Sequence, residues 1–448
     1  MRFPLLVIQK IREYAGPQFP IEFRMSGSER CAGGYDIETG IRIAEILDGK
    51  VDLIHVSVGT QESAYSEALM HPTVFQKHGE NVCYAAEIKK HVNTPVVTVG
   101  ALSDPDKMEE ILAAGQADVL ALGRGLIADP YIPKKIREGR GEDVVCCLRC
   151  HECFNAMMTR DDIYCTVNPS IGREIRFSKL PQPAVQKKVL IAGGGPAGMA
   201  AAITAAKRGH TVTLCEKSGE LGGKLHNMEG VQAKEQILKL LRQMEQEVRR
   251  LPVKLRLNTA VDETVIDEEK PDVLFAATGA RPFIPPIPGA DNKIVTPGAG
   301  LNPASVSGKQ VVIIGGGLVG CELAVELCQC GNKVTVLEYM NAVAQGAPRF
   351  HYIALREEMK KLEAVRTSMQ VKSITDQGVT AAPIGGQDEF FPADLVVMAC
   401  GLRTARELDD LRTLVPVFIP IGDYERPAKI GTAIRQAVDM VIDMDSFL

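Results

Sequence analysis

The sequence predicts an α/β protein with parallel sheets, in which a cysteine-rich segment separates two kinds of nucleotide-binding architecture. Three observations support this prediction. Short apolar runs alternate with amphipathic stretches over the first 145 residues, as in βαβ units. A cysteine-dense stretch follows from residue 146. The rest of the chain twice shows an apolar run, a glycine-rich turn and a helical pattern, which predicts two nested Rossmann-like domains.

The first 145 residues read as four strand–helix units. The predicted strands are the apolar runs at residues 21–25, 53–58, 96–99 and 119–122. Amphipathic stretches at residues 37–47 and 81–90 predict helices between them. We therefore expect one parallel sheet with a helix layer in this region.

Four residues at the ends of these strands are candidate flavin ligands. Gly100 follows the third strand, and Gly123 and Arg124 follow the fourth. In a (β/α)8 barrel the loops after the last two strands commonly bind phosphate. Arg24 closes the first strand, where it could face a flavin ring. A structural ion pair explains Arg24 equally well.

The cysteine-rich segment, residues 146–186 with a linker at its end, predicts a metal centre. Cys147, Cys150, Cys153 and Cys165 follow the spacing C-x2-C-x2-C-x11-C. Three crowded thiolates closed by a fourth favour a [4Fe–4S] cluster. Tetrahedral zinc is the alternative, although zinc sites more often combine two separated CxxC pairs. Cys146 is out of register with this spacing.

The first glycine motif predicts an FAD-binding domain over residues 187–290 and 402–448. Gly193, Gly195 and Gly198 form GxGxxG between an apolar run and an Ala-rich helix. The glycines allow a pyrophosphate to approach the backbone at the helix N-terminus. Glu216 ends the next strand, where it can accept ribose hydroxyls. No cysteine pair follows it at residues 221–225, which excludes a disulfide reductase.

The second motif predicts an NAD(P)-binding domain over residues 291–401. Gly315, Gly317 and Gly320 again form GxGxxG, and Glu338 ends the following strand. Tyr339 comes next, with no arginine to meet a 2′-phosphate. This pattern favours NADH over NADPH.

Two buried strands and a late Gly-Asp pair fit this nested arrangement. Residues 272–279 and 394–401 are apolar runs that end in small residues, suited to a hinge between the two domains. Gly422 and Asp423 follow a further apolar run. The pair resembles the element by which two-dinucleotide flavoproteins hold the FAD ribityl and pyrophosphate groups, although an ordinary turn has the same composition.

Composition excludes several classes of partner. The 448 residues carry 51 basic and 56 acidic side chains, a net charge of 51 − 56 = −5, without a basic block. We expect no nucleic-acid partner and no polybasic membrane surface. The longest uncharged stretch, residues 189–206, contains a cluster of glycines, so we expect no membrane span. With no secretory signal recognised and twelve cysteines, we expect a cytoplasmic protein.

Together these blocks resemble one family, the NADH:flavin oxidoreductases of old-yellow-enzyme type with a C-terminal flavin-reductase module. It includes 2,4-dienoyl-CoA reductases, 2-enoate reductases and trimethylamine dehydrogenase. The match looks closest to clostridial enoate reductases, including bile-acid and cinnamate-type enzymes. The residues that carry this likeness are 70–73, 78–79, 97–102, 122–124 and 147–165.

The resemblance implies that residues 1–145 are the C-terminal half of an FMN-binding (β/α)8 barrel. A complete barrel takes about 250 residues, whereas the cysteines here begin near residue 146. About four strands, and the tyrosine that protonates the substrate in the family, have no counterpart. The family's loop histidine has no clear match near Tyr65, so we assign no catalytic residue. We expect a partner chain to supply the other half barrel, and an intact protein to be a homo-oligomer.

The implied function is a relay from NADH through FAD and the [4Fe–4S] cluster to FMN, which reduces an activated C=C bond in an unsaturated acid, CoA ester or enone. Two alternatives stay open. The chain could be an FAD/iron–sulfur diaphorase that serves another protein. It could also be an inactive fragment or a subunit completed by another chain.

Overall fold

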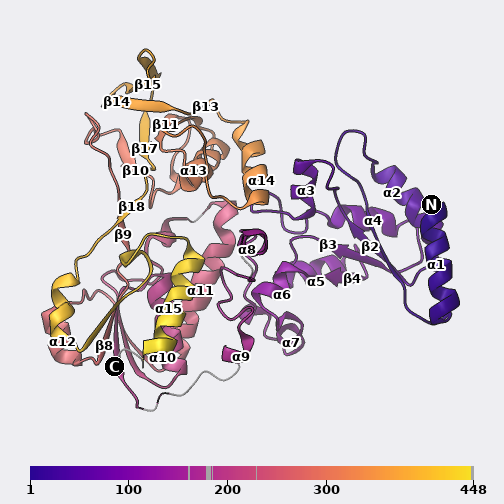
Figure 1. The fold of residues 1–448 in the computed structure, drawn as a ribbon, viewed down its shortest axis with the longest axis horizontal. Coiled ribbons are helices and arrows are strands. Elements are labelled where there is room, and N and C mark those ends of the chain that lie inside the picture. Colours follow the sequence, from indigo (N-terminus) through magenta and orange to yellow (C-terminus); the bar gives the residue numbers. More distant parts are fainter. Residues whose placement is uncertain (160–161, 178–182, 184, 229, 445–448) are drawn as a thin grey trace. The chain divides into compact units, whose positions relative to one another are not determined.

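The computed structural model describes residues 1–159, 162–177, 183, 185–228 and 230–444. They form two compact units, one of residues 1–151 with 348–354 and one of residues 152–347 with 355–448 (Figure 1). Much of the predicted linker at residues 177–188 lies outside the described residues. No helix among the described residues is long and apolar enough to cross a membrane.

The first unit contains a parallel four-stranded sheet in the order β1-β2-β3-β4. Its strands are β1 (Glu22–Ser26), β2 (Leu53–Ser57), β3 (Val96–Val99) and β4 (Val119–Ala121). Its helices are α1 (Arg2–Ala15), α2 (Ile37–Leu47), α3 (Ala64–Met70), α4 (Val82–Lys89), α5 (Pro105–Ala113), α6 (Arg124–Ala128) and α7 (Ile132–Arg137). All four predicted strands and both predicted helices are present.

The core of this unit lies between the sheet and its helices. Ile54 and Val56 of β2 are fully buried and belong to one apolar cluster with Leu47 of α2 and Ile88 of α4. Because side chains alternate across a strand, His55 faces the opposite side of the sheet. Arg24, which lies opposite His55 in the strand register, therefore also occupies the face away from the helices.

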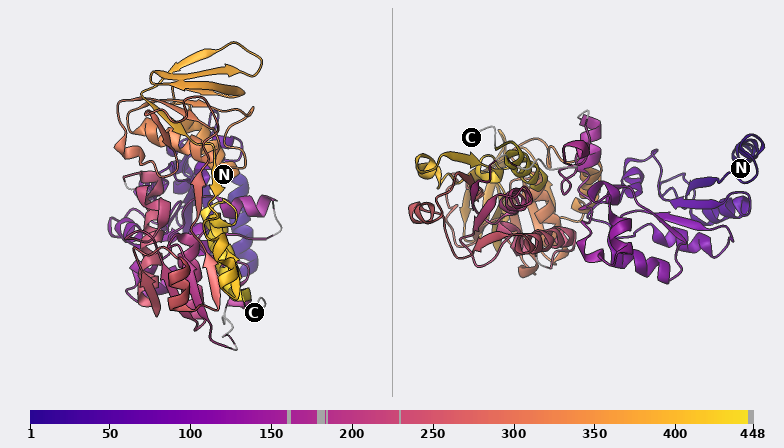
Figure 2. Two further views of the ribbon diagram at one scale, coloured as in Figure 1. Left: turned by 90° about the vertical axis from the view of Figure 1, so that its left-hand side faces the viewer. Right: turned by 90° about the horizontal axis from the view of Figure 1, so that it is seen from below.

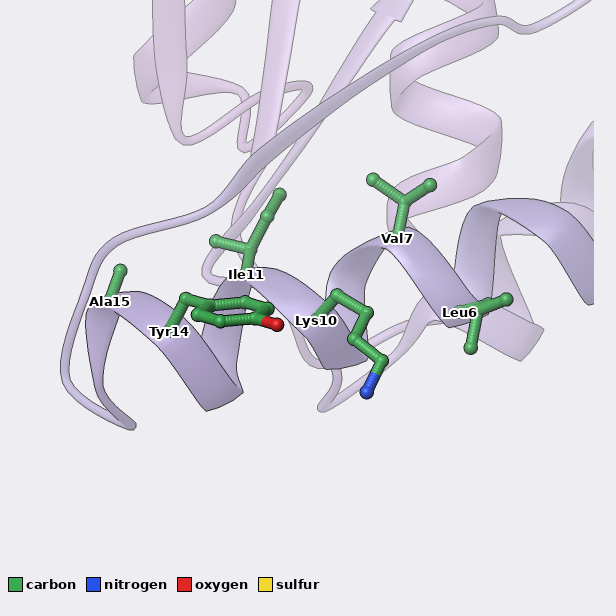
Figure 3. A pocket seen from close by; sticks show the side chains of 6 residues that line it. All are labelled: Leu6, Val7, Lys10, Ile11, Tyr14 and Ala15. Carbon is green, nitrogen blue, oxygen red and sulfur yellow. The ribbon is translucent and has the colours of Figure 1, made fainter.

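One face of α1 and both edges of this sheet lack a partner within the first unit. An apolar groove on α1 is lined by Leu6, Val7, Lys10, Ile11, Tyr14 and Ala15 (Figure 3). Tyr14 is 89% exposed and Leu6 is 50% exposed. β1 and β4 each pair with a single strand. Open edges of this kind are ready to pair with another strand.

The second unit contains two five-stranded parallel sheets (Figure 1). The first has the order β19-β8-β5-β6-β7, with β5 (Lys188–Ala192), β6 (Thr211–Cys215), β7 (Val253–Arg256), β8 (Val273–Ala276) and β19 (Val417–Pro420). Its helices are α10 (Pro196–Lys207), α11 (Glu235–Arg250), α12 (Glu263–Glu269) and α15 (Ile430–Asp443). The short helices α8 (Glu152–Thr159) and α9 (Glu174–Phe177) precede this sheet along the chain.

The second sheet has the order β10-β17-β11-β12-β13. Its strands are β10 (Val295–Pro297), β11 (Gln310–Ile314), β12 (Lys333–Leu337), β13 (Ala364–Arg366) and β17 (Leu395–Met398), with helices α13 (Leu318–Gln329) and α14 (Arg349–Met359). An antiparallel sheet that the sequence analysis missed follows β13, with β14 (Met369–Thr375), β15 (Gly378–Pro383) and β16 (Glu389–Pro392). It forms the orange strands at the top of the left view in Figure 2.

A short antiparallel pair joins the two sheets of the second unit. The chain leaves the first sheet through β9 (Ala280–Pro282) and returns through β18 (Leu402–Thr404), and these strands pair with each other. They follow β8 and β17 directly, at the two places where the sequence predicted a hinge. The second sheet is therefore inserted into the first domain's chain, as a nested arrangement requires.

Candidate dinucleotide and flavin sites

The first glycine motif forms a tight turn between β5 and α10. Gly193 has φ +108°, and a Cβ there would lie 2.5 Å from the carbonyl oxygen of Ala277. A Cβ at Gly198 would collide with the carbonyl oxygen of Gly193. Gly195, the N-cap of α10, has no atom within 4 Å of its Cβ position. Two glycines thus permit close packing, and the third leaves the helix N-terminus open to a phosphate.

Glu216 is held at the end of β6 by three hydrogen bonds. Its Oε2 accepts from the backbone N–H of Gly194 at 2.7 Å, and its Oε1 accepts from the N–H and hydroxyl of Ser218 at 2.8 and 2.9 Å. The residue is only 7% exposed. Because a carboxylate offers about four acceptor positions, one position stays available for a ribose hydroxyl.

The second glycine motif repeats this geometry between β11 and α13. Gly315 has φ +108°, and a Cβ there would lie 2.5 Å from the carbonyl oxygen of Ala399. A Cβ at Gly320 would collide with the carbonyl oxygen of Gly315, whereas Gly317 at the N-cap is open. Both motifs therefore present the same kind of cradle for a pyrophosphate.

Glu338 occupies the position that corresponds to Glu216. It accepts from the backbone N–H of Gly316 at 2.5 Å and from that of Met340 at 2.7 Å. Its neighbours Tyr339 and Met340 are exposed. An arginine lies on the neighbouring strand, where the carbonyl of Arg366 accepts from the N–H of Glu338 at 2.8 Å. Arg366 could not be found from the sequence pattern, because it lies 28 residues beyond Glu338.

The Gly-Asp pair lies against the first glycine motif. Gly422 has φ +61°, and a Cβ there would lie 2.8 Å from Cβ of Ala197 in the first turn of α10. Its N–H donates to Oε1 of Gln436 at 2.8 Å, and Asp423 accepts from the N–H of Ala428 at 3.0 Å. The pair therefore lies next to the helix end where a bound FAD would place its pyrophosphate.

In the first unit, Arg24 lies on the sheet face away from the helices, beside a hydrogen-bonded pair of buried His55 and half-exposed Glu22. Its strand register places it opposite His55, whose Nδ1 is 2.6 Å from Oε1 of Glu22. Burial lowers the pKa of His55, and the charge of Arg24 acts in the same direction, whereas Glu22 opposes both. Nε2 of His55 is buried and has no hydrogen-bond partner among the described residues.

Arg124 begins α6 and lies in a cluster of histidines. Its Nη1 is 2.8 Å from Nε2 of His151, and its Nη2 donates to the carbonyl of Pro72 at 3.0 Å. Burial, followed by the charges of Arg124 and Arg24, lowers the pKa of His71 to about 4. Burial and Arg124 also hold the pKa of His151 well below its usual range. The histidines are therefore neutral at pH 7, and the arginines carry the positive charge.

Of the two candidate glycines in this unit, Gly100 packs closely against a side chain, and Gly123, which precedes Arg124, leaves open space. Gly100 has φ +134°, and a Cβ there would lie 2.6 Å from Nδ2 of Asn81, a buried donor without a partner among the described residues. Gly123 has no atom within 4 Å of its Cβ position. Two arginines, an unpaired amide donor and the open position at Gly123 fit an anionic group such as the phosphate of FMN.

The segment that carries the four predicted cluster ligands contains the boundary between the two units. Cys147 and Cys150 belong to the first unit, and Cys153 and Cys165 to the second. The N–H of Arg149 donates to Sγ of Cys147 at 3.4 Å, the kind of bond that tunes cluster sulfurs. Among the described residues, no group of three or more potential ligands is arranged to hold a metal ion. The cluster therefore stays a prediction.

Comparison with known proteins decides the family. Residues 187–416, about half of the chain, match the pyridine nucleotide-disulphide oxidoreductase family, and residues 1–143 match the NADH:flavin oxidoreductase / NADH oxidase family. The chain is 41% identical over 410 residues to an NADH oxidase from Thermoanaerobacter brockii. The chain belongs to the NADH:flavin oxidoreductase family. It is an oxidoreductase that combines a barrel-type flavin segment with a two-dinucleotide module.

Relatives of this NADH:flavin oxidoreductase include enzymes named for reductions. It is 35% identical to a cinnamate reductase from Clostridium sporogenes, over 98% of this chain and 68% of that protein. A bilirubin reductase from Mediterraneibacter gnavus is 34% identical, over 97% of this chain and 69% of that protein. The alignment with the NADH oxidase covers 90% of this chain and 62% of the oxidase. The chain thus spans about two thirds of the length of these relatives.

Solved structures agree with this family over nearly the whole chain. A 2-naphthoyl-CoA reductase in complex with 2-naphthoyl-CoA superposes with a TM-score of 0.88 at 32% identity, over 98% of this chain and 68% of that one. Histamine dehydrogenase from Rhizobium sp. 4-9 shares the fold, with a TM-score of 0.85 at 22% identity, over 99% and 68% of the two chains.

Proposed function

We propose that this NADH:flavin oxidoreductase is an FAD-, FMN- and [4Fe–4S]-dependent enzyme that uses NADH to reduce an activated C=C bond. The observation that supports it best is the pair of matching glycine cradles, each with a carboxylate locked by two or more hydrogen bonds. When bound, the cofactors would supply the electron transfer from NADH to the alkene. The named cinnamate and bilirubin reductases support this class of substrate.

The protein's own residues would position these groups. Glu216 and Glu338 would each receive the ribose hydroxyls of one dinucleotide, and the open N-termini at Gly195 and Gly317 would receive the pyrophosphates. Arg24 and Arg124 would hold the FMN of the first unit. Cys147, Cys150, Cys153 and Cys165 would hold the cluster.

A second candidate function follows from the open sheet of the first unit. β1 and β4 each pair with only one strand, and the outer face of α1 is apolar and exposed. A second chain that supplies a complementary half barrel would cover these surfaces. Alone, the chain would then act as an NADH:acceptor diaphorase, with FAD reduction intact and alkene reduction weak.

Acceptor specificity separates the two functions. The full chain, purified anaerobically, would be assayed with NADH against ferricyanide and against cinnamate or an enone, with FAD, FMN and iron measured. Turnover of both acceptors with stoichiometric FMN supports the alkene reductase. Ferricyanide reduction alone, with substoichiometric FMN, supports the diaphorase. The absence of any NADH oxidation by FAD-loaded protein would reject both.

A further inference from the structure

A buried ionic triad connects the two dinucleotide-binding halves of the second unit. Nζ of Lys234 is 2.7 Å from Oε2 of Glu322 and 3.3 Å from Oε1 of Glu326. The two glutamates are four residues apart on α13, so they share one face of that helix. The three side chains are only 15%, 18% and 7% exposed, respectively.

The partners of this triad come from different halves of the nested fold. Lys234 ends a short 3-10 turn, η3 (Gln232–Lys234), directly before α11 of the first sheet. Glu322 and Glu326 belong to α13, the helix that begins at the second glycine motif. A second contact lies nearby, since a Cβ at Gly230 would be 3.3 Å from Cβ of Ala304 in the second half. The chain itself passes between the halves through the three-residue strands β9 and β18.

The charges of the triad depend on one another. Burial alone would lower the pKa of Lys234, but Glu322 and Glu326 together raise it, so the amine stays charged. Burial raises the pKa of Glu326, and Lys234 opposes that effect. Removing the lysine would leave two carboxylates close together in a poorly hydrated place, which is strongly unfavourable. The triad therefore resists any rearrangement that moves α13 away from Lys234.

We propose that Lys234 is a positioning residue for hydride transfer, because it fixes α13 and the second dinucleotide cradle against the FAD-binding half. This inference rests on the proposed function. The pyrophosphate cradle at Gly317 is the first turn of α13, and Glu322 lies one turn further along. A shift of that helix would move a bound nicotinamide relative to FAD. Misplacement of reacting groups by about 1 Å can cost on the order of a hundredfold in rate.

The test compares Lys234→Met with a matched control, Lys207→Met. Lys207 pairs with Glu247 at 2.7 Å, and both of these residues lie in the FAD-binding half. In FAD-loaded full chain mixed anaerobically with NADH, Lys234→Met should slow flavin bleaching about ten- to hundredfold at saturation. The half-saturating NADH concentration should change less than threefold. Lys234→Arg should recover most of the rate, and Lys207→Met should leave it unchanged.

Hydrogen exchange provides a readout that does not depend on activity. Lys234→Met should raise amide exchange in α13 and in residues 230–236, and Lys207→Met should not. A triple variant, Lys234→Met with Glu322→Gln and Glu326→Gln, removes the unpaired carboxylates that could misfold the single variant. It should still react slowly. Wild-type bleaching rates in the folded triple variant, or unchanged exchange in Lys234→Met, would overturn the proposal. If wild-type protein failed to bleach with NADH, the proposed function would fail, and the exchange comparison would still decide the role of Lys234.

Discussion

At the residue scale, the hydrogen-bonded carboxylates of Glu216 and Glu338 give the most specific indication of the ligands. Glu338 accepts two backbone N–H groups and is 9% exposed, so its carboxylate has a fixed direction before any ligand binds. Such preorganisation lowers the ordering cost of binding. Glu216 is held in a similar way, which indicates that both carboxylates have the same role, each in its own dinucleotide site.

Glu338→Ala should weaken NADH binding about ten- to hundredfold, or roughly 1–3 kcal/mol. The change removes the ribose acceptor and leaves the N–H groups of Gly316 and Met340 without their partner. Titration calorimetry with NADH on FAD-loaded protein measures it. Glu357→Ala, which breaks an exposed pair with Lys360, is the control. Unchanged affinity in the Glu338 variant would mean that this carboxylate does not hold the ribose.

Arg366 gives a prediction about the choice between NADH and NADPH. Its guanidinium is already paired with Glu389 at 2.8 Å, next to the strand that carries Glu338. Glu389→Ala would release this charge, so the ratio of kcat/KM for NADPH to that for NADH should rise about three- to tenfold. Adding Arg366→Ala should return the ratio to its original value. A ratio that stays constant in the single variant would contradict this account.

The buried histidines of the first unit predict a pH-dependent stability. A histidine whose pKa is lowered by folding binds fewer protons in the folded state, so stability falls as pH drops from about 6.5 toward the folded pKa. For His71 that value is about 4, and His55 and His151 shift in the same direction. The protection of the β2 and β3 amides against hydrogen exchange, corrected for the intrinsic exchange rate, should therefore fall between pH 6.5 and 4.5. His71→Gln should weaken this pH dependence. Equal pH profiles of amide protection in the variant and in the wild-type protein would contradict the prediction.

At the scale of elements, the sequence located the regular strands and helices well. All predicted strands of the first 145 residues and both Rossmann-type turns are present, because their apolar periodicity and glycine positions are local features. The antiparallel strands β14–β16 were missed, since Met369–Thr375 buries only two of its seven residues and has no continuous apolar run. Arg366, His151 and Lys234 were missed because their partners come from distant parts of the chain.

The cysteine-rich segment predicts the metal content of the protein. Anaerobically purified protein should contain about four irons per chain, because Cys147, Cys150, Cys153 and Cys165 have the spacing of a [4Fe–4S] centre. Cys153→Ser should lower the iron content and bleach the cluster absorbance. Cys328→Ser is the control, because this cysteine is not a predicted cluster ligand and its thiol contacts the carbonyl of Lys361. One zinc per chain without iron would show that the spacing was misread.

At the scale of the whole molecule, the fold combines a sheet with open edges and a self-contained two-dinucleotide module. The module has both cradles, the Gly-Asp element and the connecting strands within the chain. The described first unit has a sheet of four strands, with Arg24 on the sheet face away from the helices and Arg124 at the start of α6. We therefore expect NADH oxidation to be more robust than alkene reduction in residues 1–448, and addition of a complementary half barrel to raise FMN content and alkene turnover together.

We propose that this one chain holds both FAD and NADH, so that bound NADH reduces the flavin. An anaerobic titration of FAD-loaded protein with NADH, followed by flavin absorbance, tests it most directly. We predict complete bleaching of FAD, with about one NADH consumed per FAD. One further NADH should be consumed for each pair of one-electron acceptors that the protein carries. The Gly317→Val variant, whose side chain would occupy the open N-terminus of α13, should bind FAD but bleach poorly. FAD that is bound stoichiometrically yet stays oxidised in excess NADH would contradict the account.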